Sequence, residues 1–211
     1  MKIAIDGPAG AGKSTVARAL ARRLGFSYLD SGALYRALAW AALGQGADLD
    51  GEEGLARLLD SLELRPDQAG VWVNGTLVTS ALRRPDVDEA ASRVARHPAV
   101  RAAMVRLQRQ LGEGVDMIAD GRDIGSVVWP DAEVKIFLTA SLAKRAARRA
   151  LEQPQEDQGQ IAQAIAERDA HDAERPVGAL LIAPGAIVVD TSELSVEETV
   201  ERLAEIVEAV P

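Results

Sequence analysis

Five short apolar runs, separated by stretches with helical periodicity, dominate the hydrophobic pattern of this 211-residue chain. The runs are IAI at 3–5, FSYLD at 26–30, DMIAD at 116–120, EVKIFLTA at 133–140 and AIVVDTS at 186–192. Continuous apolar runs of this length are typical of strands that are buried on both faces of a parallel sheet. Because helical stretches alternate with them, the pattern predicts an α/β protein with a five-stranded parallel sheet flanked by helices.

Two segments depart from this alternation. Residues 62–79, LELRPDQAGVWVNGTLVT, predict short antiparallel strands with a hairpin turn at Asn74-Gly75, and two helices between 85 and 111 are expected to meet at Pro98. Residues 141–175 predict two helices around a polar bend near 154–159, as in a mobile lid. We expect one unit, 1–211, with a core of residues 1–61, 100–140 and 176–211, an acceptor-binding insertion at 62–99 and a lid region at 141–175.

The octet GPAGAGKS at 7–14 matches the phosphate-loop pattern G-x-x-x-x-G-K-[ST]. Its glycines let backbone N–H groups turn toward phosphate oxygens, Lys13 adds a positive charge, and the hydroxyl of Ser14 can ligate Mg²⁺. A glycine turn that matches by accident is the alternative, but a strand before the octet and a helix after it favour a phosphate site. The residues expected to hold a triphosphate are Gly7, Gly10, Ala11, Gly12, Lys13, Ser14 and Thr15.

Composition limits the other partners. The chain has 24 Lys and Arg against 32 Asp and Glu, a net charge of −8. This charge argues against sequence-independent binding of nucleic acid, which needs a basic surface. It has no cysteine and no apolar run of about 18 residues, so disulfides, thiolate metal sites and membrane spans are not expected. We expect a cytoplasmic monomer that binds neither nucleic acid nor membranes.

Arginines account for all but four of the cationic residues, and their positions are informative. Arg145, Arg148 and Arg149 share one helical face, while Arg168 and Arg175 flank Asp172 on another helix. Solvated faces with ordinary ion pairs would give the same spacing. Neither group of arginines establishes a lid by itself.

Two strand ends carry a further acid, glycine and arginine each, in DSGALYR at 30–36 and DGRDIG at 120–125. Ligands of open α/β sheets bind at these carboxyl ends, and arginine can hold a phosphate through two parallel hydrogen bonds. Asp30 acting only as a helix N-cap, and Asp123 acting only as a partner of Arg122, remain alternatives. Together the arginine-bearing elements exceed what one nucleotide needs, which predicts two phosphate-bearing substrates.

Two large classes of phosphate-loop protein are excluded. The guanine-reading Asn-Lys-x-Asp element is missing, since Asn74 is the single asparagine of the chain, and there is no Leu-Ser-Gly-Gly-Gln signature of transporter ATPases. A small phosphotransferase remains, or an ATP-driven switch that never passes the phosphoryl group on.

The chain resembles the bacterial-type cytidylate kinase family. The matching stretches, which span nearly the whole chain, are IDGPAGAGKST, LDSGALYR, EAASRVARHPAVR, IADGRDIGSVVWPDAEVKIFL, the ERD..D..R series from Glu167 to Arg175, and VVDTSELS. This resemblance implies a P-loop kinase fold with a lid, and transfer of the γ-phosphoryl group of ATP to CMP or dCMP with Mg²⁺. Ser126 and Trp129 depart from the threonine and phenylalanine common in the family.

The resemblance also implies roles for individual residues. Ser31, Arg36 and Arg122 would hold the acceptor phosphate, and Ser92, Arg101 and Asp123 would face cytosine. Arg168 and Asp172 would face the ribose, and Arg175 would reach the reacting phosphates. Apart from the resemblance, we expect Arg145 and Arg149 to bind ATP and Ser14 to ligate the metal. Lys13, Arg36, Arg122 and Arg175 form the expected catalytic set.

Base discrimination and the chemical step follow from elementary chemistry. The carboxylate of Asp123 can accept a hydrogen bond from the N4 amine of cytosine, whereas uracil has an oxygen there. The acceptor oxygen of a nucleoside monophosphate is already anionic, so alignment and charge neutralisation suffice. Another P-loop kinase, acting on UMP, AMP or a metabolite such as shikimate, and a non-catalytic ATP-binding module are the alternatives.

Overall fold

The five apolar runs form one parallel sheet in the computed structural model, which describes residues 1–67, 69–152, 154–155 and 157–210. The strands are β1 (Lys2–Asp6), β2 (Ser27–Asp30), β6 (Met117–Gly121), β7 (Val134–Thr139) and β8 (Ile187–Asp190). Their order is β2-β6-β1-β7-β8. The central strand β1 pairs with β6 and β7, and Ile3, Ala4 and Ile5 are fully buried. Burial on both faces explains the unbroken apolar run, and the predicted fold class is confirmed.

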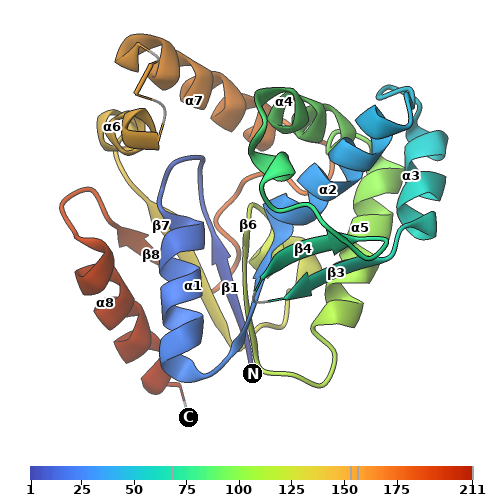
Figure 1. Ribbon diagram of the computed structural model, residues 1–211. Helices are drawn as coiled ribbons and strands as arrows, with labels where there is room; N and C mark the ends of the chain where they lie inside the picture. Colours follow the sequence, from blue (N-terminus) through green and yellow to red (C-terminus); the bar gives the residue numbers. More distant parts are fainter. Residues whose placement is uncertain (68, 153, 156, 211) are drawn as a thin grey trace. The chain divides into compact units, whose positions relative to one another are not determined.

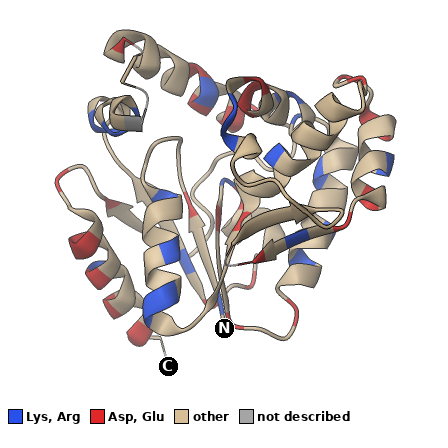
Figure 2. Ribbon diagram, in the orientation of Figure 1, with Lys and Arg blue, Asp and Glu red and all other residues tan. Residues whose placement is uncertain are grey.

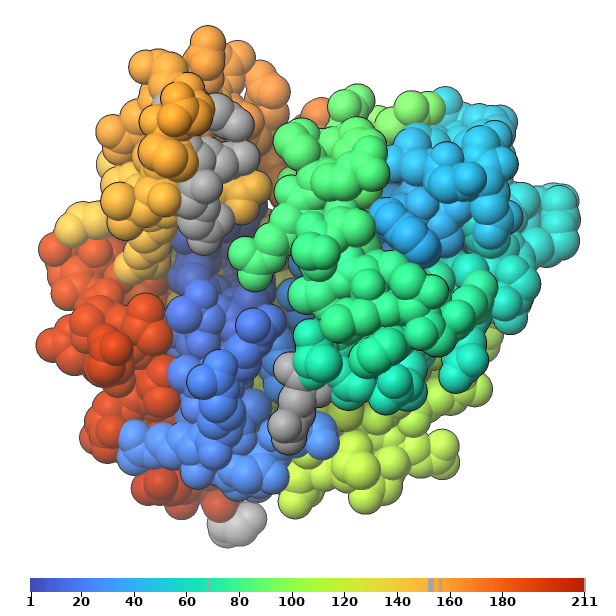
Figure 3. All heavy atoms as spheres, in the orientation of Figure 1, coloured from blue at the N-terminus to red at the C-terminus, as the bar shows by residue number. Residues whose placement is uncertain are grey.

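Four α-helices and a π-helical turn accompany this sheet in the first of two structural units, residues 1–28 and 114–211. They are α1 (Lys13–Leu24), α6 (Leu142–Glu152), α7 (Gln158–Ala173), α8 (Val196–Glu208) and η2 (Ile124–Val128). Figure 1 shows α1 and α8 side by side against the sheet, and the two helices are also neighbours in the space-filling view of Figure 3. A hydrophobic core of this unit lies there, where Ile5, Leu20, Ile136 and Leu203 pack together.

Charge alone does not hold α8 in place. Its surface is acidic whereas α1 carries arginines, as Figure 2 shows, and Arg23 forms an ion pair with Glu201. Both side chains are exposed, so water and salt weaken their attraction. Burial of Leu203, Ala204 and Val207 against the core therefore contributes most of the stability of this contact.

The helix pair α6 and α7 is the pair predicted as a lid. Asp157 caps α7 by accepting hydrogen bonds from the N–H groups of Gly159 (2.9 Å) and Gln160 (3.1 Å). Within the predicted lid region, Gln153 and Glu156 lie outside the described residues. Movement of the pair stays a prediction.

The second unit, residues 29–113, contains the remaining helices and a small antiparallel sheet. Its elements are α2 (Ser31–Gly44), α3 (Glu52–Ser61), β3 (Leu64–Asp67), β4 (Gly70–Val73), β5 (Thr76–Leu77), η1 (Ala81–Arg83), α4 (Pro85–Val94) and α5 (Pro98–Leu111). Asn74 and Gly75 have φ of 49° and 76°, the left-handed conformation that a tight hairpin turn requires, so the predicted hairpin is confirmed. Gln68 of this segment lies outside the described residues.

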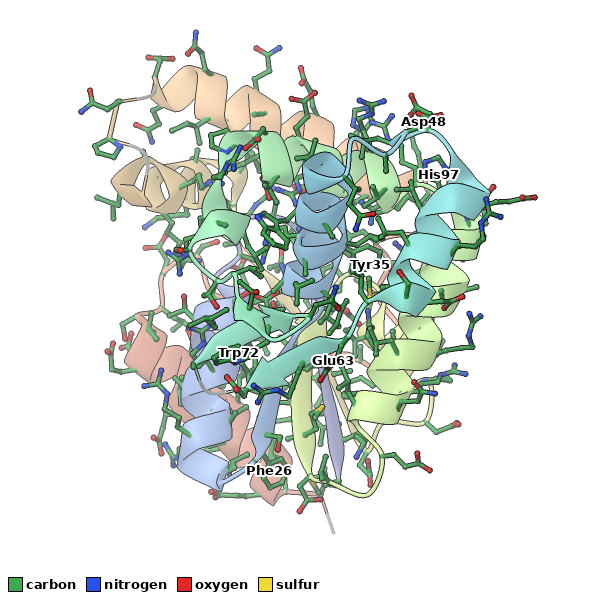
Figure 4. All side chains as sticks on the ribbon, turned by 45° about the vertical axis from the view of Figure 1, so that its right-hand side comes forward. Phe26, Tyr35, Asp48, Glu63, Trp72 and His97 are labelled. Carbon is green, nitrogen blue, oxygen red and sulfur yellow. The ribbon has the colours of Figure 1, made fainter. Side chains whose placement is uncertain are left out.

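The junction predicted at Pro98 separates α4 from α5. His97 precedes it, and its Nε2 lies 2.8 Å from the carbonyl oxygen of Leu49. Figure 4 shows His97 near Asp48, the residue before Leu49. The residue before proline is biased toward extended backbone, and His97 has ψ of 120°. This histidine therefore ties the helix junction to the loop before α3.

The two structural units have different bounds from the division expected from the sequence. The second unit takes in α2, α3 and α5 together with residues 62–99. The functional division into core, insertion and lid stays a prediction. Among the described residues, none of the helices has the length and apolar content needed to cross a lipid bilayer.

Candidate active site

The predicted phosphate loop leads directly from β1 into α1. Gly7, Gly10 and Gly12 have φ of 149°, 74° and 85°, values that other residues rarely adopt, so the glycine spacing reflects the backbone path. The helix begins at Lys13, which directs its first unbonded N–H groups toward the loop. The ammonium group of Lys13 donates to the carbonyl oxygen of Pro8 at 2.8 Å. These features form a site for an anion.

Lys13 is buried among charges of both signs. Burial lowers the pKa of Lys13 to about 7; the positive charges of Arg122 and Arg168 lower it as well, while Asp120 and Asp6 oppose them. Several cations are thus held near one another at a cost in free energy. Binding of a polyanion would relieve this repulsion, as expected of a functional site.

The stability of the protein should consequently rise with pH. Between about 7 and the ordinary value of 10.5, the unfolded state binds more protons at Lys13 than the folded state, so the free energy of unfolding increases across this window. In Lys13→Met, which keeps the buried chain without its charge, this increase should be missing. Urea unfolding at a series of pH values from 6.5 to 10.5 measures the difference between the two proteins. Parallel curves would contradict the assignment.

Ser14 and Asp120 provide neighbouring oxygen atoms at the start of α1 and near the end of β6. The hydroxyl of Ser14 donates to Asp120 at 2.8 Å, and the phenol of Tyr28 on β2 donates to the other carboxylate oxygen at 2.7 Å. Asp120 is 4 % exposed. The three residues form a connected polar group whose oxygens are of the kind that Mg²⁺ prefers.

Asp6 fixes the backbone that follows Asp123. Its carboxylate accepts hydrogen bonds from the N–H groups of Ile124 (2.8 Å) and Gly125 (2.7 Å). Burial raises the pKa of Asp6 to about 6, although these two hydrogen bonds oppose the shift. The π-helical turn η2 begins at this point, and such turns often accompany functional sites. Asp123 itself is buried.

Three of the predicted substrate-binding residues meet at Asp172. The guanidinium of Arg122 donates through Nε to Asp172 at 2.7 Å, and Arg175 forms an ion pair with its other oxygen. Burial alone would raise the pKa of Asp172, but the charges of Arg122 and Arg175 outweigh this effect and hold the pKa below its ordinary range. Two arginines are thus oriented by one buried carboxylate.

Two arginines of α6, Arg145 and Arg148, donate hydrogen bonds to backbone carbonyl groups of the phosphate loop. Arg145 donates to the carbonyl oxygens of Ala140 (3.0 Å) and Ala9 (2.9 Å), and Arg148 donates to the Thr191 hydroxyl at 3.0 Å. Arg145 is therefore bonded to groups of the protein itself. Binding of ATP by Arg145 and Arg149 stays a prediction.

In the second unit, the predicted acceptor residues lie on α2, α4 and α5. Ser31 is the buried first residue of α2, and Asp30 caps this helix by accepting from the N–H of Ala33 at 2.7 Å. Arg36, one turn further on, lies 3.3 Å from Asp30 and 4.0 Å from Asp88 of α4. Asp30 therefore caps α2, but it does not act only as a cap, because it also accepts from Arg36.

Ser92 and Arg101 belong to the same unit. The hydroxyl of Ser92 donates to the carbonyl oxygen of Asp88 at 3.3 Å, so it lies one turn from the carboxylate that faces Arg36. Arg101 is 2 % exposed, and its guanidinium lies 5.6 Å from the ring centre of Tyr35. Within each unit, residues named from the sequence are thus brought together.

Sequence reasoning missed three polar residues. Tyr28 donates to Asp120 on β6, Asp169 accepts from the N–H of Ala9 in the phosphate loop, and Asp88 faces Arg36. Asp169 lies within the ERD..D..R series, so the sequence marked the segment that contains it. The sequence did not indicate its hydrogen bond with Ala9. Tyr28 and Asp88 give no pattern in the chain that would have identified them.

The parallel sheet, the phosphate loop with its buried lysine and the oriented arginines define a P-loop phosphotransferase. The cytidylate kinase family matches residues 3–209. The chain belongs to the cytidylate kinase family. It is 50 % identical to a cytidylate kinase of Geobacillus kaustophilus, covering 98 % of this chain and 96 % of the relative, and 44 % identical to one of Bacillus cereus, covering 100 % and 97 %.

The fold recurs in a solved structure of much lower similarity. Shikimate kinase from Bacteroides thetaiotaomicron has a TM-score of 0.51 and 15 % identity, covering 99 % of this chain and 98 % of that one. This likeness concerns the fold alone. Family membership makes the chain an enzyme that transfers a phosphoryl group to a nucleoside monophosphate, with ATP and CMP as the implied substrates, and it disfavours the alternative acceptors and the non-catalytic module.

Proposed function

We propose that the enzyme transfers the γ-phosphoryl group of ATP to CMP or dCMP, giving ADP and the corresponding diphosphate, and that it requires Mg²⁺. The observation that carries this proposal is the charge around Lys13, whose pKa is lowered by burial and by Arg122 and Arg168. Such a cluster suits a polyanionic substrate, and the two reacting nucleotides together supply many negative charges.

The residues near the phosphate loop fit a magnesium ion. Ser14 and Asp120 supply hard oxygen atoms, and Mg²⁺ commonly uses one or two protein ligands together with phosphates and water. The described residues include no cluster of three or more His, Asp or Glu suited to a metal, in keeping with a metal carried on the nucleotide. When bound, Mg²⁺ would neutralise charge on the donor phosphates.

The protein's part in the reaction is alignment and charge neutralisation. Lys13 and the loop N–H groups would hold the β- and γ-phosphates of ATP, while Arg122 and Arg175, oriented by Asp172, would stabilise the charge that moves between the substrates. No general base is required, because the attacking phosphate oxygen is already anionic. Exclusion of water by the α6–α7 pair would limit hydrolysis of ATP.

We propose that further residues bind the acceptor. In the second unit, Ser31 and Arg36 would hold its phosphate, and Ser92 and Arg101 would contact cytosine. In the first unit, Asp123 would accept a hydrogen bond from the N4 amine, and Arg168 and Asp172 would contact the ribose. Arg101, Asp123 and Asp172 are buried, and a charged side chain that packing holds in one orientation is suited to specific contacts with a ligand, which supports this assignment.

A coupled assay of ADP release over a panel of acceptors tests the proposal. CMP and dCMP should give the highest kcat/KM, and UMP, AMP and shikimate should give much lower values. Faster turnover of UMP, AMP or shikimate would overturn the proposed acceptor. Binding of ATP without acceptor-dependent ADP release would support the non-catalytic alternative.

Asp123→Asn should reduce the preference for CMP over UMP. The amide can present an N–H donor to the O4 of uracil, whereas the carboxylate can only accept, so discrimination should fall by about 100-fold. The ratio of kcat/KM for the two acceptors measures it. Asp131→Asn, an exposed change in the same unit, should leave the ratio unaltered. An unchanged ratio in Asp123→Asn would show that this carboxylate does not read the base.

We further propose that the enzyme is a cytoplasmic monomer that binds neither nucleic acid nor membranes. The net charge of −8 supports the absence of nucleic acid binding. Sedimentation equilibrium tests the monomer, and a mass of twice 22.4 kDa would contradict it.

A further inference from the structure

Asp169 on α7 joins the helix pair α6–α7 to the phosphate loop. One carboxylate oxygen accepts a hydrogen bond from the N–H of Ala9 at 2.9 Å, and the other pairs with Arg145 of α6. Arg145 also donates to the carbonyl oxygen of Ala9 at 2.9 Å. Both polar backbone groups of one loop residue are thus bound by side chains from the two helices.

Apolar contacts reinforce this connection. The methyl group of Ala9 belongs to a small buried cluster with Ala146 of α6 and Ile161 and Ile165 of α7. At Gly10, an added Cβ would lie only 3.1 Å from the Cβ of Arg145, so the loop and α6 are closely packed. Ala9 is therefore held through its N–H, its carbonyl and its side chain.

Helix α7 also carries Asp172, a residue that we propose to contact the acceptor nucleotide. Asp172 lies one turn beyond Asp169 on α7 and orients Arg122 and Arg175. Because neighbouring turns of a helix are rigidly connected, a shift of Asp169 would be transmitted to Asp172. A single turn of α7 thus contacts both the phosphate loop and the two arginines that we propose to contact the transferred phosphoryl group.

We propose that Asp169 is a positioning residue that sets the position of the phosphate loop relative to the two arginines that Asp172 orients. The inference rests on the proposed function of those arginines. Asp169 contacts neither substrate and acts through Ala9 and Arg145. Its loss should impair alignment during the reaction and leave the contacts that bind CMP in the ground state largely intact.

Amide hydrogen exchange tests the structural part without reference to any substrate. In Asp169→Ala, the N–H of Ala9 loses its acceptor and should exchange with solvent about 10-fold faster or more. Glu167→Gln, which changes an exposed carboxylate on the same helix, should leave the exchange of Ala9 unaltered. Unchanged exchange in Asp169→Ala would overturn the inference, whatever the substrate of the enzyme.

Kinetics test the functional part. Asp169→Ala should lower kcat by about 100-fold with little change in the KM for CMP, because a small misplacement of reacting groups has an effect of this size. Asp169→Asn, which keeps an oxygen for the N–H of Ala9 but removes the charge facing Arg145, should give a smaller loss. Glu167→Gln should match the unaltered enzyme.

A double-mutant cycle distinguishes positioning from general damage. The double variant, Asp169→Ala with Arg145→Met, should lose about as much kcat as either single variant. The losses should not multiply, because both residues act on Ala9 as one unit. Independent, multiplying losses or an unchanged kcat in Asp169→Ala would overturn the proposal. The coupled assay of the unaltered enzyme over the panel of acceptors tests the proposed function separately. A failure of that function can therefore be distinguished from a failure of this inference.

Discussion

Lys13→Ala is expected to lower kcat by about 100- to 1,000-fold or more while the protein remains folded, comparable with the loss of one preorganised donor to a developing charge. The ammonium group lies at the start of α1, within the loop, and donates only to a backbone carbonyl among the contacts that we describe. Burial lowers its pKa to about 7. The charge is therefore an energetic cost to the folded protein, which function explains better than stability.

Steady-state turnover of CMP and thermal unfolding of the variant measure these two effects separately. Lys13→Met serves as a companion that retains most of the buried side chain. Lys144→Ala is the control, since it removes an exposed lysine whose partner is the surface residue Glu193. A kcat close to that of the unaltered enzyme in Lys13→Ala would remove this residue from the catalytic set.

Gly7→Ala is expected to lower both the stability and the affinity for ATP severely. A Cβ at this position would lie 2.0 Å from the carbonyl oxygen of Leu138 and 3.0 Å from its carbonyl carbon, and the φ of 149° is unfavourable for any side chain. Leu138 belongs to β7, which pairs with β1 and β8, so its backbone cannot move without disturbing the sheet. We expect a loss of at least about 3 kcal/mol.

Gly25→Ala separates the steric conflict from the backbone preference. Gly25 also has a positive φ, of 71°, but a Cβ there would meet no atom within 4 Å. Its substitution should therefore cost only about 1 kcal/mol, the ordinary price of a left-handed conformation. Urea unfolding of both variants makes the comparison, and equal losses would show that the contact with Leu138 is unimportant.

Local patterns made much of the fold predictable. Residues 3–5 and 117–120 are buried on both faces of the sheet, and such burial leaves a continuous apolar run in the sequence. The phosphate loop was equally clear, because its function requires glycines at fixed spacing beside a lysine. The hairpin turn at Asn74-Gly75 was predictable for the same reason, since few residues accept a positive φ.

Partners of charged side chains were much less predictable. Tyr28 and Asp120 are 92 positions apart, and Ala9 and Asp169 are 160 apart, yet each pair is joined by a hydrogen bond. Periodicity reports which face of an element is apolar, but it does not report which distant element packs against that face. The helical face shared by Arg145, Arg148 and Arg149 was predictable from their spacing, whereas the hydrogen bond from Arg145 to the carbonyl oxygen of Ala9 was not.

The sequence by itself determined the class of fold, the phosphate loop and the family, because each depends on residue types at short, fixed spacings. Only the tertiary structure decided that Asp172 orients two arginines, that Asp6 holds the backbone after Asp123, and that Asp169 bonds to Ala9. Such contacts form when distant segments pack, and a carboxylate in the chain has many possible partners until packing brings one of them within hydrogen-bonding distance.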